Sequence, residues 1–196
     1  MGPGDPGAFP VGIFAGGHSE ARYLIWLNTV VTTHPNADGM DIVGLSSDAT
    51  TLGAVVAANR VTMQSMIPSA GGVVFVGGVG DSFMSANQVE GTSGNALQIL
   101  GLDSTLVADS NLAVANDISR LSPLNGDIFL GPNSTHNLVA GQCSTYIDLG
   151  TDNRVLCGSP LDSPDASTEA STRARAIVAY GDAIQKVRLD AMRSRQ

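Results

Sequence analysis

The stretch 71–83 constrains the fold of this chain more than any other part of the sequence. It opens with an uninterrupted apolar run at residues 73–76, which is β-branched or aromatic throughout. Such a run is too short for a helix and is typical of a strand that is buried on both faces. The sequence therefore predicts a central, fully buried strand at this point.

A glycine turn follows this strand. Gly77, Gly78 and Gly80 let the backbone turn sharply, and Asp81 or Ser82 is suited to cap a helix that begins after the turn. Free amide groups at a helix start attract anions. We therefore expect the three glycines and Ser82 to hold an anionic or phosphorylated ligand, with Asp81 as a weak candidate for a catalytic base.

The string Gly-Val-Gly-Asp-Ser-Phe at residues 78–83 resembles the Gly-Ala-Gly-Asp-x-Phe signature of ribokinase-like sugar kinases. In that family the Asp is the catalytic base and the glycines form an anion hole. The resemblance covers only this string. The chain is much shorter than those kinases and shows no other pattern of the family, so the sequence is not assigned to it.

A second glycine turn follows the first predicted strand. Gly16 and Gly17 precede His18 and Ser19. In a parallel sheet both turns lie at the carboxyl edge, where α/β proteins bind ligands. We expect Gly16, Gly17 and Ser19 to contribute to ligand binding and His18 to be a second weak catalytic candidate.

The predicted strands recur about every 30 residues, which is the length of a β-α unit. The segment 20–33 is compatible with a helix or with two strands, and the helix is favoured. The sequence shows no convincing internal repeat. It thus predicts an α/β or α+β fold with a mixed sheet flanked by helices, and the alternative is a mainly β sandwich. The strands are expected to start near residues 11, 41, 72, 105 and 127, and the helices to span 49–66, 83–89 and 112–121.

The last third of the chain is expected to differ from the rest. Cys143 and Cys157 flank a predicted antiparallel hairpin, and the sequence favours two buried thiols over a disulfide while leaving both open. Residues 158–164 are a predicted linker, and 165–193 a long amphipathic helix. That helix either docks on its own domain or contacts a neighbouring subunit. The domain prediction is an irregular arm at 1–10, one globular domain at 11–157, the linker, and a C-terminal unit at 165–196.

Composition limits the function. Only 14% of residues are charged, against roughly 25% in ordinary soluble domains. The net charge of −8 argues against nucleic acid. No apolar run is long enough for a membrane span, and the first residues do not have the pattern of a signal peptide. The spacings of His and Cys predict no metal site, and no cofactor is expected.

Two functional hypotheses follow. The first is a structural, self-associating subunit of a homo-oligomeric assembly, for instance a virion or particle component, assembled in the cytoplasm and using 165–193 as its candidate contact. The second is a small-molecule α/β enzyme or binding protein that holds an anionic ligand at the glycine turns 16–19 and 77–82. Scarce charge and small polar residues favour the first hypothesis.

Overall fold

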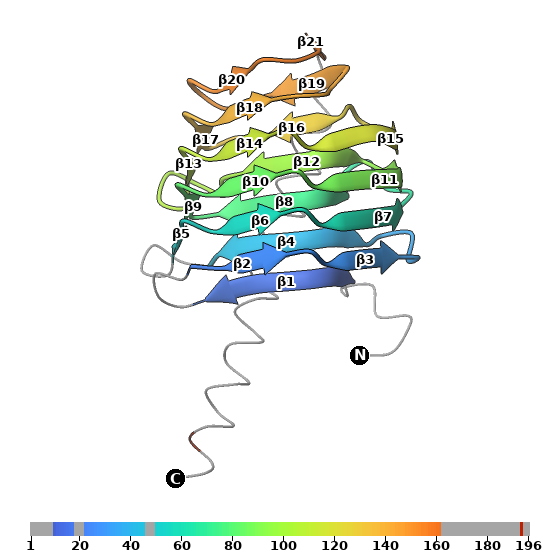
Figure 1. Cartoon of the computed structure of the whole chain (residues 1–196). Coiled ribbons are helices and arrows are strands. Elements are labelled where there is room, and N and C mark those ends of the chain that lie inside the picture. Colours follow the sequence, from blue (N-terminus) through green and yellow to red (C-terminus); the bar gives the residue numbers. More distant parts are fainter. Residues whose placement is uncertain (1–9, 18–21, 46–49, 162–192, 194–196) are drawn as a thin grey trace.

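The computed structural model describes residues 10–17, 22–45, 50–161 and 193. Its strands form four parallel sheets that wind around one apolar core, so the chain coils upward from β1 to β21 as a β-solenoid (Figure 1). Every pairing between the named strands is parallel. The three complete turns, at residues 38–64, 71–93 and 95–123, each contribute one strand to each sheet, and neighbouring turns stack by strand pairing.

The largest sheet, sheet A, has seven strands and runs the height of the solenoid. Three of its longer strands are buried along their whole length, which explains the continuous apolar run at residues 73–76. The strands of sheet A are β1 (Val11–Gly17), β4 (Asp38–Gly44), β8 (Gly71–Gly77), β12 (Asn95–Leu100), β16 (Ile128–Leu130), β19 (Thr145–Asp148) and β21 (Ser159–Pro160).

Sheet B is a narrow corner sheet and sheet C the face beside it. Sheet B contains β5 (Thr51–Leu52), β9 (Val79–Gly80), β13 (Ala108–Asp109) and β17 (Ser134–Thr135). Sheet C contains β2 (Leu24–Trp26), β6 (Val55–Ala57), β10 (Phe83–Ser85), β14 (Leu112–Val114), β18 (Leu138–Ala140) and β20 (Arg154–Val155).

Sheet D completes the coil and has only four strands, so it stops below the top of the solenoid (Figure 1). Its strands are β3 (Thr29–Thr32), β7 (Arg60–Gln64), β11 (Gln88–Ser93) and β15 (Asp117–Pro123).

A row of stacked asparagines fixes the corner between sheets C and D. Asn28, Asn59, Asn87 and Asn116 occupy equivalent positions in successive turns, and each is bonded to the next through its side chain at 2.9–3.1 Å. The residue before each asparagine has a positive φ between 50° and 55°. Three of these four residues are alanines, so the turn geometry is held by the amide ladder and not by glycine.

A second ladder follows the corner between sheets B and C. Asn111, Asn137 and Asn153 stack in the same manner, and the backbone N–H of Ser82 donates to Asn111 Oδ1 at 3.1 Å. These two ladders satisfy backbone groups that a buried corner would otherwise leave without partners.

The main core lies between sheet A and sheets C and D. Its largest side chains are those of Phe75, Met40, Ile42, Met63 and Met84, all fully buried. Where sheet A begins, it approaches sheet D so closely that only glycine fits. A Cβ on Gly72 would stand 2.5 Å from a Val89 methyl group and 2.7 Å from the Ala96 carbonyl oxygen.

The expected α/β or α+β fold is therefore wrong. The alternative, a β sandwich, is also wrong, because the sheets wind around one core and are not two stacked layers. Only the mainly β content of that alternative is confirmed. Residues 10–17, 22–45 and 50–161 contain no helix. The helices expected at 49–66, 83–89 and 112–121 are short strands of sheets B, C and D. The segment 20–33 carries β2 and β3, the option that was less favoured. The long helix expected at 165–193 lies outside the described residues apart from Arg193.

The hairpin expected between the cysteines is also wrong. Its two strands, β19 and β20, belong to sheets A and C and pair in parallel with other strands. The two cysteines are nevertheless adjacent, because Cys143 precedes β19, Cys157 follows β20, and the winding of the chain brings these two positions together. Cys143 and Cys157 form a disulfide with a Cα–Cα distance of 5.4 Å, so the favoured interpretation of two free thiols is wrong as well.

Candidate functional site

The two glycine turns lie at the same edge of the solenoid, the carboxyl end of sheet A. Gly17 pairs in register with Gly44, and Gly44 with Gly77. The sequence argument thus places both turns at one edge correctly. His18 and Ser19 lie outside the described residues, so their position relative to this edge stays a prediction.

No helix follows Gly77 and Gly78, and the neighbouring amides are engaged in the solenoid. The N–H of Gly78 donates to the Gly44 carbonyl at 3.3 Å, and that of Asp81 to the Asp109 carbonyl at 3.2 Å. Ser82 is buried, and its hydroxyl donates to the Gly80 carbonyl at 2.8 Å. Ligand binding at these residues stays a prediction that this hydrogen-bond pattern does not favour.

Asp81 itself is exposed at the corner after β9, with a φ of 49°. It occupies the position taken by Ser110, His136 and Asp152 in later turns, the residue immediately before the second ladder. A base in this position faces solvent, and the resemblance of 78–83 to a kinase signature falls on a strand corner without a helix.

A histidine and two carboxylates meet further along this corner. The Nδ1 atom of His136 lies 2.9 Å from Asp109 Oδ1, and its Nε2 atom lies 4.0 Å from Asp152 Oδ2. All three side chains are exposed by 47% or more, so water screens the interaction. Within the described part of the chain, no group of three or more His, Cys, Asp or Glu side chains is arranged to hold a metal ion.

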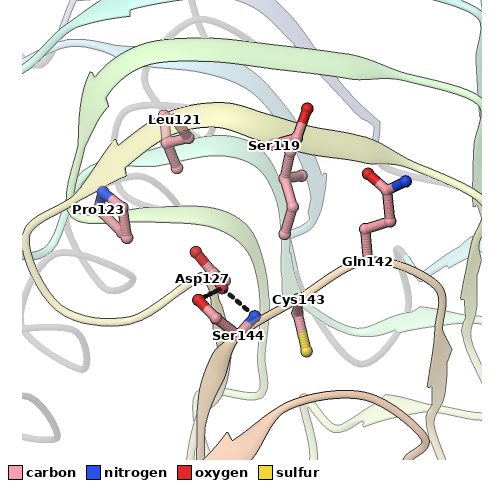
Figure 2. A pocket seen from close by; sticks show the side chains of 8 residues that line it. Ser119, Leu121, Pro123, Asp127, Gln142, Cys143 and Ser144 are labelled. Carbon is pink, nitrogen blue, oxygen red and sulfur yellow. Dashed lines mark hydrogen bonds between the residues drawn. The ribbon is translucent and has the colours of Figure 1, made fainter.

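A pocket of about 390 Å³ lies where sheet D ends, beside β15 and the Cys143–Cys157 disulfide (Figure 2). Asp127 points into this region and is 5% exposed. Its Oδ2 atom accepts hydrogen bonds from the backbone N–H and the hydroxyl of Ser144 and from the N–H of Thr145. This carboxylate therefore anchors the loop before β19, and the contacts assign it a structural role. The pocket is lined by Ile118, Ser119, Leu121, Pro123, Asp127, Gln142, Cys143 and Ser144.

The edge of β15 beside this pocket is protected against pairing with another strand. Its register against β11 shifts between Gln88 and Glu90, and the N–H of Ser119 donates to Asp117 Oδ1 at 3.1 Å. The strand ends at Pro123, which has no N–H to offer. Shifted registers, charges and proline are common means of blocking edge-to-edge association. Bonding to the Ser119 hydroxyl and N–H also lowers the pKa of Asp117.

The outward face of sheet D is charged. Arg60 donates twice to Glu90 Oε1, at 3.1 and 2.8 Å, and Thr62 donates to the same atom at 3.0 Å. Arg120 lies 3.9 Å from Glu90 Oε2. The bonds from Arg60 and Thr62 lower the pKa of Glu90, with that from Arg60 the larger cause.

The outward face of sheet C is apolar instead. Its inward positions fill the core, and the alternate positions form two rows that continue from turn to turn. No residue in the rows of β2, β6, β10, β14 and β18 is charged, and at β20 the first row ends in the exposed Arg154, the register partner of Leu138. The first row is Leu24, Val55, Phe83, Leu112 and Leu138, and the second is Trp26, Ala57, Ser85, Val114 and Ala140.

The exposure of this face is greatest at its lower end. Leu24 is 71% exposed, Trp26 58% and the adjoining Leu27 65%. Sequence reasoning missed the face, because its residues were assigned to helices and to the core. The signal that identifies it is the recurrence of an apolar–apolar–x–x–Asn pattern, seen at Asn28, Asn59, Asn87 and Asn116 with separations of 31, 28 and 29 residues.

No family model matches the chain, and comparisons with curated proteins and with solved structures gave no significant match. Within the described residues, no helix is long and apolar enough to span a membrane.

Proposed function

We propose that this chain is a structural, self-associating subunit of a homo-oligomeric assembly, and that its copies meet through the outward face of sheet C. The observation that carries the proposal is the continuous apolar surface of β2, β6, β10, β14 and β18. Contiguous exposed apolar surface of this kind is uncommon on monomeric proteins and marks interaction sites.

The distribution of charge supports contact between identical copies at this face. The chain has a net charge of −8, so two copies repel one another. Sheet D carries the exposed Arg60 and Arg120 around the half-buried Glu90, and the corner of sheet B exposes Asp81 and its acidic neighbours. The sheet C face brings no like charges together over five turns. The chain's low charged fraction of 14% points in the same direction.

Trp26 provides a direct test, because it is the only tryptophan in the chain and lies on the proposed contact. Self-association is expected to shift its fluorescence emission to shorter wavelength as protein concentration rises, since the indole leaves water. The replacement Leu112→Asp, on the same face, is expected to abolish the shift. Gln64→Asp adds the same charge on exposed sheet D and is the matched control. Emission that does not depend on concentration, in a protein of monomer mass, would overturn the proposal.

The second hypothesis, an enzyme or binding protein for an anionic ligand, remains a proposal with weaker support. The engaged amides near Gly78 and the absence of a helix after it, within the described residues, do not favour such a site. Thermal-shift measurements with inorganic phosphate test this alternative, with Asp81→Asn as the comparison. Cytoplasmic assembly also stays a proposal, and the Cys143–Cys157 disulfide does not favour it, because disulfides persist mainly in oxidising compartments.

A further inference from the structure

The pocket beside β15 exists because sheet D stops earlier than its neighbours. Sheets A and C continue above β15, with β16, β19 and β21 in sheet A and β18 and β20 in sheet C. In the turn of β15, the passage from Val114 to Ile128 includes a strand of sheet D. In the next turn, only the segment 141–144 separates Ala140 from Thr145, which is too short for such a strand and its corners. The pocket lies between β15 and this segment (Figure 2).

The walls of this pocket are mainly apolar. Ile118 belongs to the main core, and Leu121 and Cys143 pack against that core from partly buried positions. Pro123 completes the apolar wall. The volume of about 390 Å³ is within the range of small-molecule sites, which are mostly apolar and use a few polar groups to orient the ligand. The pocket therefore has the size and the lining of a site for a small organic molecule.

One polar group in the pocket is only half engaged. The Oδ2 atom of Asp127 accepts two hydrogen bonds from Ser144 and one from Thr145. Among the described residues, none donates a hydrogen bond to Oδ1 and none forms an ion pair with Asp127. Figure 2 shows this second oxygen directed away from Ser144, toward the side of the pocket lined by Leu121 and Pro123. A nearly buried carboxylate oxygen that faces a cavity favours a hydrogen-bond donor, and a cationic donor above all.

We infer that this pocket binds a small molecule with a protonated primary amine and a short apolar body. The ammonium group donates to Asp127 Oδ1, and the apolar body lies against Leu121 and Pro123. An ammonium group has three N–H donors, and those that Asp127 does not accept reach the mouth of the pocket, where Ser119 and Gln142 are exposed to water. A neutral alcohol makes the same hydrogen bond without the charge, and an anion is repelled by the carboxylate.

The inference is independent of the proposed self-association, because the pocket lies where sheet D ends and not on the outward face of sheet C. The test compares two probes of the same length, n-butylammonium and 1-butanol, on the full-length chain. An NMR titration measures the affinity of each probe and identifies the backbone amides that shift. We expect the ammonium to bind about tenfold more tightly than the alcohol, because a hydrogen bond to a charged group is stronger than a neutral one. The largest shifts are expected at Leu121, Ser144 and Thr145.

Asp127→Asn separates the contact with the ligand from the anchoring of the loop. The Asn side-chain oxygen can still accept from Ser144 and Thr145, while its NH₂ group takes the place of Oδ1 and turns that acceptor into a donor. We expect the preference for n-butylammonium to disappear. Asp152→Asn is the matched control, because it removes the same charge from a side chain that is 70% exposed at the corner between sheets B and C. It is expected to keep the tenfold preference.

Four results would overturn the inference. The first is equal affinity of the parent protein for the two probes, and the second is binding of neither. The third is a set of shifts confined to the outward face of sheet C. The fourth is an Asp127→Asn chain that still prefers the ammonium. The titration of the parent protein needs no variant, so the first three results are decisive even if Asp127→Asn fails to fold.

Discussion

The side-chain oxygen of Asn87 accepts hydrogen bonds from both the backbone N–H and the side-chain Nδ2 of Asn59, at 3.1 and 2.9 Å. Asn87 in turn donates to the Val56 carbonyl at 2.8 Å and to Asn116 Oδ1 at 2.9 Å. One buried side chain thus connects three turns of the solenoid.

Replacing Asn87 with alanine should therefore be costly. It removes the acceptor of the buried Asn59 N–H and a donor to the Val56 carbonyl, each worth about 1–3 kcal/mol, while Asn116 Oδ1 keeps the bond from the backbone N–H of residue 87. We expect a loss of about 3 kcal/mol or more in the free energy of unfolding, measured by urea denaturation. The exposed Gln142 is the control, and its replacement by alanine should change stability by under about 0.5 kcal/mol. Equal urea midpoints for Asn87→Ala and the parent protein would show that the ladder does not hold the turns together.

The glycine at position 72 should tolerate no side chain. A Cβ there meets Val89 and the carbonyl oxygen of Ala96, and the backbone of a central strand cannot move aside cheaply. We expect Gly72→Ala to destabilise the protein by about 1–3 kcal/mol through overpacking. Gly80→Ala is a useful comparison, because its nearest neighbour is a flexible Leu52 methyl group at 3.1 Å. A larger loss at Gly80 than at Gly72 would contradict the close approach of sheets A and D.

The disulfide should stabilise the upper end of the solenoid. It closes a loop across a separation of 14 residues, and the chain-entropy model assigns about 3 kcal/mol to a loop of about 15 residues. The double replacement Cys143→Ser with Cys157→Ser should lower stability by this order, with faster hydrogen exchange in β19 and β20 than in β8. Exchange that rises equally in all three strands would show that the disulfide does not act locally.

The Arg60–Glu90 pair should contribute stability that depends on pH. The pKa of Glu90 lies below the usual Glu value of about 4.3, because Arg60 and Thr62 donate hydrogen bonds to its carboxylate. A carboxyl group whose pKa is lowered on folding stabilises the protein fully above the usual pKa. That contribution disappears as the pH falls through the lowered value.

The difference in urea midpoint between the parent protein and Glu90→Gln should therefore be constant from pH 7 down to about pH 5 and should shrink below about pH 4. Gln64→Ala, at the exposed other end of β7 from Arg60, serves as a control with no such dependence. A difference that grows as the pH falls would have the wrong sign for this pair.

Part of sheet A was accessible from sequence, because a strand buried on both faces produces a short continuous apolar run. The strand β12 (Asn95–Leu100) was not predicted, and the strand expected near residue 105 is replaced by β13 of sheet B at Ala108–Asp109. Residues 73–76 are the clearest case, and the strands near 11, 41 and 127 are confirmed with them. The spacing of about 30 residues was also correct. One turn of this solenoid is nearly as long as a β-α unit, so the spacing alone does not distinguish the two, and the β-α unit was predicted.

The helices were predicted wrongly for a physical reason. Strands of sheets B, C and D are only two to seven residues long and are separated by corners, so apolar positions such as Val55, Val56 and Val61 imitate a helical stripe. What decides between the two is the asparagine at each corner, preceded by a residue with positive φ. A single asparagine does not distinguish a solenoid corner from a helix. The repetition of asparagine at 28, 59, 87 and 116 does.

The candidate site was predictable only in part. The common edge of Gly17 and Gly77 follows from parallel strands and was predicted. The anion site depended on a helix after Gly78, and that residue leads into β9 instead. The apolar face of sheet C depends on which neighbours stack above Leu24 and Phe83, and this is a property of register between turns that lie about 30 residues apart.

The mass of the full chain in solution tests the proposed self-association most directly. Light scattering on a size-exclusion column, at several protein concentrations, is expected to show a discrete homo-oligomer for the parent protein and for Gln64→Asp. The Leu112→Asp chain is expected to have the mass of a monomer with unchanged circular dichroism. A parent protein that remains a monomer at every concentration, or an oligomer that Leu112→Asp leaves intact, would contradict assembly through the sheet C face.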